Sequence, residues 1–160
     1  MTKTRPAVER VRPPRFAVRL INPVLRRLLR RPGSRPSRHL ILLCFTGRRT
    51  GRRYQLPVAP QPIDGHLAVL TNSGWRHNFR GGLDCLLYVH GEPVTARGIL
   101  VDEVSAVVGA YRAVLTALGP RHARQAGLRI NVGRAPTDAE LAEAVRRYGL
   151  SYVTFDRTQR

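Results

Sequence analysis

A glycine-bounded, arginine-rich segment is the part of the sequence whose residue types point most directly to chemistry. The run GRRTGRR occupies residues 47–53 and combines two glycines, four arginines and one threonine hydroxyl. Successive backbone N–H groups of a glycine turn can form an anion-binding nest. Arginine guanidiniums match phosphate and carboxylate oxygens two at a time. The segment therefore predicts a site for a phosphate or carboxylate group, although a solvated turn between two strands is an alternative interpretation.

The other residues that could do chemistry show no catalytic or metal-ligand spacing. The histidines form no HxxxH or HExxH pattern, so no metal site is predicted; they are His39, His66, His77, His90 and His122. Ser73 and Ser105 lie in no nucleophile elbow, which argues against acyl-transfer hydrolysis. Cys44 and Cys85 lie in apolar runs without CxxC spacing. They are predicted to be buried free thiols in a reducing, cytoplasmic compartment, with a disulfide or a reactive thiol as alternatives.

Length and charge distribution limit the classes of protein that the chain can be. Its 160 residues, 42% of them hydrophobic, suit one folded domain with a core. The first 53 residues hold 16 of the 28 basic residues but one of the 10 acids. The net charge of +18 is therefore concentrated near the N-terminus. The remainder has no basic motif interleaved with stacking aromatics, which argues against nucleic-acid binding. No apolar stretch approaches the length of a membrane span.

The N-terminal third divides into two predicted segments ahead of the main domain. Residues 1–14 are rich in arginine and proline and are predicted to be a basic arm that is disordered or extended. Residues 15–37 are predicted to form an amphipathic helix followed by a linker, with Pro23 as a kink or a helix start. This helix could pack on the domain, or its basic face at residues 15–30 could dock on an anionic membrane surface. Residues 38–160 are predicted to be a single domain.

The predicted domain contains short strands in an order that excludes a Rossmann sheet. Strands are expected at residues 39–46, 54–60, 66–71, 84–90, 93–101, 128–132 and 150–155. Asp64-Gly65 and His90-Gly91 are expected to close tight hairpins, the first joining strands 54–60 and 66–71. Helices are expected from a cap at Asp102 to Leu118, and from a capping box at Thr137 to Tyr148. Because strands and helices do not alternate regularly, an α+β antiparallel barrel with appended helices is favoured.

The order of two motifs resembles the deazaflavin-dependent nitroreductase family, a branch of the flavin and deazaflavin split-barrel oxidoreductases. The first is Thr46–Gly51 (TGRRTG), with Pro57 six residues after its second glycine. The second is Trp75–Arg80 (WRHNFR), which is similar to the family's Trp-x-x-Asn signature with Phe in place of Leu. Thr95–Arg97 (TAR) follows in the family's order. Tyr54 stands where a basic residue is common in that family.

The resemblance implies a fold, an activity and a set of cofactor-binding residues. The implied fold is a split β-barrel of the FMN-binding type, with an N-terminal amphipathic helix and two further helices. The implied activity is hydride transfer from reduced deazaflavin coenzyme F-420 to an electron-poor acceptor such as a quinone, an activated alkene or a nitro compound. By resemblance, the cofactor would be held by Gly47, Arg48, Arg49, Thr50, Gly51, Pro57, Thr71, Ser73, Trp75, Asn78 and Arg80. No catalytic residue is assigned; Tyr111, Tyr148 and Tyr152 are candidates near the substrate by composition only.

Two other functions fit the same sequence. A barrel of this kind could bind FMN, haem or another tetrapyrrole instead, and the chromophore that co-purifies would distinguish these ligands. A basic module that docks on the inner face of a membrane, with an inert barrel, is the alternative from another class. Related barrels commonly pair, which makes a homodimer one candidate assembly.

Overall fold

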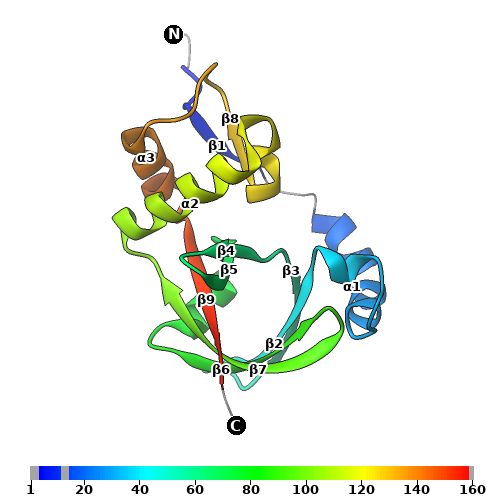
Figure 1. Ribbon diagram of the computed structural model, residues 1–160. Coiled ribbons are helices and arrows are strands. Elements are labelled where there is room, and N and C mark those ends of the chain that lie inside the picture. Colours follow the sequence, from blue (N-terminus) through cyan, green and yellow to red (C-terminus); the bar gives the residue numbers. More distant parts are fainter. Residues whose placement is uncertain (1–3, 12–14, 159–160) are drawn as a thin grey trace. The chain divides into compact units, whose positions relative to one another are not determined.

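A computed structural model of the protein describes residues 4–11 and 15–158; for residues 15–21 and Pro120 it describes the backbone alone. The described residues group into two compact units (Figure 1). The sheet unit comprises the described parts of residues 13–100 and 152–160. The helical unit comprises those of residues 1–12 and 101–151. The single domain predicted for residues 38–160 is therefore divided between two units.

The sheet unit is a curled, antiparallel, seven-stranded half-barrel (Figure 1). Its strands are β2 (Ile41–Thr46), β3 (Arg53–Val58), β4 (Gln61–Ile63), β5 (His66–Thr71), β6 (Leu83–Val89), β7 (Glu92–Val101) and β9 (Ser151–Arg157). They lie in the order β3-β2-β6-β7-β9-β5-β4. The unit also contains helix α1 (Arg15–Leu29) and the 3-10 helices η1 (Pro36–Arg38) and η2 (Gly74–Phe79). The mixed α+β class and the curled antiparallel sheet agree with the sequence-based prediction.

Strand β2 has an unbroken apolar run in its sequence, and the structure shows why. Ile41, Leu43 and Phe45 face the core of the half-barrel, as expected for alternate residues on one face. Leu42 points to the other face and is also fully buried. Helix α1 packs against β2 and β3, so both faces of β2 are covered. A strand covered on both faces reads as continuous hydrophobic sequence rather than as an alternation.

The C-terminal end of helix α1 lies against the sheet. Leu29 is completely buried, whereas Val24 remains 60% exposed. The helix runs through Pro23 rather than starting there. The side-chain pattern predicted for residues 15–21 lies outside what the structure describes. Among the described helices, none has the length and apolar character needed to cross a membrane.

The helical unit contains the largest departure from the predicted organisation. It comprises β1 (Val8–Arg10), α2 (Val104–Leu118), the 3-10 helix η3 (Pro120–Ala126), β8 (Leu128–Ile130) and α3 (Asp138–Tyr148). Within the predicted arm, residues 8–10 are extended rather than disordered and pair antiparallel with β8. Val8 is 2% exposed, so a partner strand far along the chain supplies the burial that the local sequence lacks. Residues 1–3 and 12–14 lie outside the described part.

The two long helices of this unit begin at side-chain caps. At α2 the cap is Glu103 rather than the predicted Asp102, and its carboxylate accepts hydrogen bonds from the backbone N–H groups of Ser105 and Ala106. At α3 the predicted capping box of Thr137 and Glu140 is present in both directions. Hydrogen bonds from Arg134 and from the Thr137 backbone lower the pKa of Glu140 to about 2.

The predicted pairing of strands 54–60 and 66–71 is wrong, although the turn between them is correct. Asp64-Gly65 joins β5 to the short strand β4, while β3 pairs with β2 at the opposite edge of the sheet. Pro60 lies between β3 and β4 and has no N–H to donate to a ladder. The first strand ends at Val58, and the chain crosses to the other edge of the sheet before the hairpin forms.

The two predicted hairpin turns have nearly the same backbone conformation but different surroundings. Asp64 and Gly65 have φ values of 50° and 77°, and His90 and Gly91 have φ values of 53° and 83°. Positive φ at both central residues is the type I′ pattern that suits two-residue hairpins. A Cβ on Gly65 would meet open space, whereas one on Gly91 would overlap the backbone of Pro32. The turn at Gly91 therefore packs directly against the segment that follows α1.

Substituting Gly91 by alanine should destabilise the protein more than substituting Gly65 by alanine. Both changes place a non-glycine residue at positive φ, at a cost of about 1–2 kcal/mol. Gly91→Ala adds a backbone overlap, which costs about 1–3 kcal/mol more. Urea unfolding followed by circular dichroism would measure both free energies. Equal losses for the two variants would show that Pro32 is not held against this turn.

Candidate functional site

A pocket in the sheet unit brings together the two motifs that the sequence singled out. Its volume is about 560 Å³, and it is lined by Gly47, Arg48, Arg49, Thr50, Tyr54, Gly74, Trp75, His77 and Asn78. The first four belong to the turn between β2 and β3, and the last four belong to η2. The lining contains two arginines and no acidic residue. The pocket therefore favours an anionic ligand by charge.

Arg48 fastens the turn to the segment after η2. Its guanidinium donates hydrogen bonds to the backbone carbonyls of Arg80, at 2.7 Å, and of Gly82. Its backbone N–H donates to Oδ1 of Asn78 at 3.0 Å. These contacts occupy the side chain that the resemblance assigned to a phosphate. In this structure Arg48 therefore positions the turn. Arg49, the other arginine of the lining, makes no hydrogen bond or ion pair with another described residue.

Some backbone N–H groups in the turn are paired within it, and others are not. The N–H of Gly47 donates to the Arg52 carbonyl, and the N–H of Gly51 donates to the Gly47 carbonyl. Within the described chain, the backbone N–H groups of Arg49 and Thr50 have no such acceptor. Gly51 has a φ of 67°, a conformation that glycine adopts without strain. Two successive N–H groups and one guanidinium are thus left as donors at the tip of the turn, and such a set of donors suits an anion.

Aromatic side chains form the other wall of the pocket. The rings of Tyr54 and Phe45 stack with centroids 4.8 Å apart, and Trp75 lies 6.1 Å from Phe45. A Cβ on Gly47 would lie 3.0 Å from the Tyr54 ring, so glycine allows this close approach. Arg52 lies over the outer side of the Tyr54 ring at 5.6 Å. A flat ligand could lie against these rings while an attached anionic group meets the turn.

Several residues that the resemblance assigned to the cofactor lie outside the lining of this pocket. They are Gly51, Pro57, Thr71, Ser73 and Arg80. Thr71 is 5% exposed and its Oγ1 accepts a hydrogen bond from the Ser73 N–H, so it stabilises the turn after β5. Pro57 pairs with Leu42 in the β2–β3 ladder. Tyr54, Gly74 and His77 line the pocket without having been predicted. Tyr54 could have been found as the aromatic residue that follows the arginine turn.

The three tyrosines proposed near a substrate do not line the pocket either. Tyr111 lies on α2 and is 1% exposed, and burial raises its pKa to about 12. Tyr111 does not line this pocket, and a place for it near a substrate stays a prediction. Tyr148 lies on α3 of the helical unit, and Tyr152 is 6% exposed on β9. Neither contributes to the lining residues described above.

The cysteines are free, as predicted, and lie on opposite faces of the sheet. Cys85 is part of the core of the half-barrel, whereas Cys44 follows the core residue Leu43 and faces the side covered by α1. Burial raises the pKa of Cys85 to about 12, so its thiol is protonated at neutral pH. Within residues 4–11 and 15–158, no three histidine, cysteine or acidic side chains gather as metal ligands would.

Asn78 links the two motifs, which makes a specific pair of substitutions informative. Its Oδ1 accepts from the Arg48 N–H, and its Nδ2 donates to the Trp75 carbonyl at 2.9 Å. Asn78→Ala removes both bonds and should lower the free energy of unfolding by about 1–2 kcal/mol. Asn78→Asp keeps the acceptor and should slow hydrogen exchange at the Arg48 amide relative to the alanine variant. Identical exchange in both variants would contradict this link.

Comparisons with known proteins add little to this geometry. No family model and no curated protein matches the chain. Among solved structures, one similar chain is the conserved hypothetical protein Rv2991 from Mycobacterium tuberculosis. It is 13% identical, with a TM-score of 0.44 over 99% of this chain and 87% of that chain. This similarity is too low to assign a fold family or a function.

Proposed function

We propose that the protein is an oxidoreductase that binds coenzyme F-420 in the pocket between the arginine turn and η2, on a split β-barrel of the FMN-binding type. The reaction would be hydride transfer from the reduced cofactor to an electron-poor acceptor such as a quinone, an activated alkene or a nitro compound. The observation that carries the proposal is the meeting of the two motifs: residues 47–50 line one pocket with residues 74, 75, 77 and 78, and the Arg48–Asn78 hydrogen bond joins the two segments.

The residues present fit the chemical parts of such a cofactor. Coenzyme F-420 carries a tricyclic ring, a phosphodiester and a glutamate tail. The guanidinium of Arg49 and the free N–H groups of Arg49 and Thr50 suit the phosphodiester by charge and donor count. Trp75 offers an aromatic surface to the ring, and Tyr54, held between Phe45 and Arg52, lines the pocket beside it. The pocket volume lies within the range of small-molecule sites, which is about 300–1,000 Å³.

The protein's own contribution would be to hold and orient the ligand. When bound, the cofactor supplies the hydride chemistry, and the surrounding residues supply position, shielding and charge. Arg48 and Asn78 keep the donors of the turn at a fixed distance from the aromatic wall. Tyr54 and Trp75 would exclude water from one face of the ring. The acceptor class, a homodimer, a cytoplasmic location and docking of residues 15–30 on a membrane stay predictions.

A titration of the purified protein with oxidised coenzyme F-420, beside FMN, tests the proposal. Trp75 lines the pocket and is the sole tryptophan, so quenching of its fluorescence reports binding directly. We expect saturable quenching by coenzyme F-420 at micromolar concentration and weak quenching by FMN. Binding of FMN alone would move the function to the flavin branch. Binding of neither would overturn the proposal.

A further inference from the structure

A second pocket lies in the sheet unit, where β5 begins and β9 ends. Its volume is about 320 Å³, and six of its ten lining residues are apolar: Leu67, Leu87, Val89, Val94, Ala96 and Phe155. A series of ring contacts leads from Tyr54 through Phe45 and Phe79 to Phe155, with centroids 4.8, 4.9 and 5.9 Å apart. These core rings separate the second pocket from the candidate cofactor site. The two pockets are therefore distinct.

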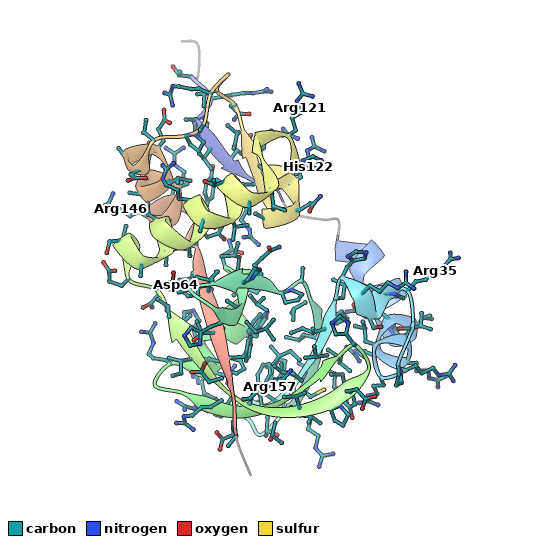
Figure 2. All side chains as sticks on the ribbon, in the orientation of Figure 1. Arg35, Asp64, Arg121, His122, Arg146 and Arg157 are labelled. Carbon is teal, nitrogen blue, oxygen red and sulfur yellow. The ribbon has the colours of Figure 1, made fainter. Side chains whose placement is uncertain are left out.

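Charged side chains gather at the rim of this apolar pocket. His66 and Asp156 are joined by a 2.7 Å contact between Nδ1 and Oδ1, and both are about half exposed. Arg157 follows Asp156 in the sequence at the end of β9 (Figure 2) and also lines the pocket. Arg157 is exposed and makes no ion pair with another residue in the part of the chain that the structure describes. Because Asp156 is already engaged by His66, Arg157 is the charged side chain of this rim that is left for a ligand.

We propose that this pocket binds a small amphiphilic carboxylate, with its apolar body against Leu87, Val89 and Val94 and its head group on Arg157. Apolar walls gain free energy by covering a hydrocarbon chain, and an arginine fork pairs with a carboxylate through two hydrogen bonds. A doubly charged phosphate suits the rim less well, because Asp156 lies beside Arg157 and repels a second negative charge. The proposal does not depend on coenzyme F-420 binding at the other pocket.

Octanoate is a suitable probe, with octanol and acetate as matched comparisons. Octanol keeps the hydrocarbon chain without the charge, and acetate keeps the charge without the chain. In methyl NMR spectra of the full chain, octanoate should shift the signals of Leu87, Val89 and Val94 in a saturable manner. Methyl signals of the helical unit, such as Val107, should not move. Octanol should bind more weakly at the same methyl groups, and acetate should not bind.

Two substitutions test the head group. Arg157→Gln should weaken octanoate binding by about fivefold or more, as expected when a charge-assisted pair is lost, and should leave octanol binding unchanged. Arg35→Gln is the matched control, because Arg35 is an exposed arginine of the same unit that does not line the pocket. Both side chains are at the surface, so neither change threatens folding.

A third substitution tests the apolar walls. Val94→Phe fills the pocket and should abolish binding of both octanoate and octanol while coenzyme F-420 binding persists. The proposal is overturned if octanoate does not saturate, if its shifts gather around Trp75, or if Arg157→Gln binds octanoate as tightly as Arg35→Gln. If coenzyme F-420 does not bind, the octanoate results still test the proposal for this second pocket.

Discussion

Replacing Phe79 by alanine is expected to lower the free energy of unfolding by about 3–5 kcal/mol, the range for truncating a fully buried phenylalanine. Phe79 is 0% exposed at the end of η2. Its ring meets Phe45 at 4.9 Å, Trp75 at 5.8 Å and Phe155 at 5.9 Å, all edge to face. The substitution removes three aromatic contacts at once and leaves a cavity that rigid strands on several sides cannot close.

Chemical denaturation followed by circular dichroism would measure this loss. Ile99→Ala is a useful control, because Ile99 is also apolar and in the sheet unit but is 40% exposed. It should cost less than about 1 kcal/mol, since little surface is returned to water. Comparable losses for the two variants would mean that Phe79 is not the centre of the aromatic core.

The second large effect concerns the candidate cofactor site. Arg49→Ala is expected to weaken coenzyme F-420 binding by about 1–3 kcal/mol, or about 5- to 150-fold, as for a lost charge-assisted hydrogen bond. Arg49 is exposed at the tip of the turn and makes no contact that holds the fold, so stability should not change. Quenching of Trp75 would give the dissociation constant.

Two companion variants make the Arg49 result specific. Arg121→Ala removes an exposed arginine of the helical unit (Figure 2) and should leave binding unchanged, which controls for net charge. Arg48→Ala should lower stability as well as affinity, because Arg48 donates to the Arg80 and Gly82 carbonyls. An unaltered dissociation constant for Arg49→Ala would remove the turn from the proposed site.

The local parts of the structure could be predicted from the sequence. The apolar run of β2, the capping box at Thr137 and the two type I′ turns each depend on residues within a few positions of one another. The resemblance also identified the two motifs that line one pocket, because their order along the chain is sufficient for that comparison.

Features that depend on distant residues were missed. The sequence analysis assigned Arg48 to cofactor binding. The residues near Arg48 in the sequence do not show that its guanidinium reaches the carbonyls of Arg80 and Gly82. The pair of His66 and Asp156 is separated by 90 residues and forms only because β9 lies beside β5. Strand β1 was missed for the same reason. Along the chain, residues 13–100 of the sheet unit lie between β1 and its partner β8.

The position of β9 has a consequence for how the sheet is made during synthesis. In the sheet order β9 lies between β7 and β5, yet it is translated after every other strand of that sheet. Until it leaves the ribosome, β7 and the β4–β5 hairpin have no partner between them and each presents an unpaired edge. Such edges recruit other chains and promote aggregation. Nascent chains that stall before residue 151 should therefore depend on chaperones far more than the full-length chain does.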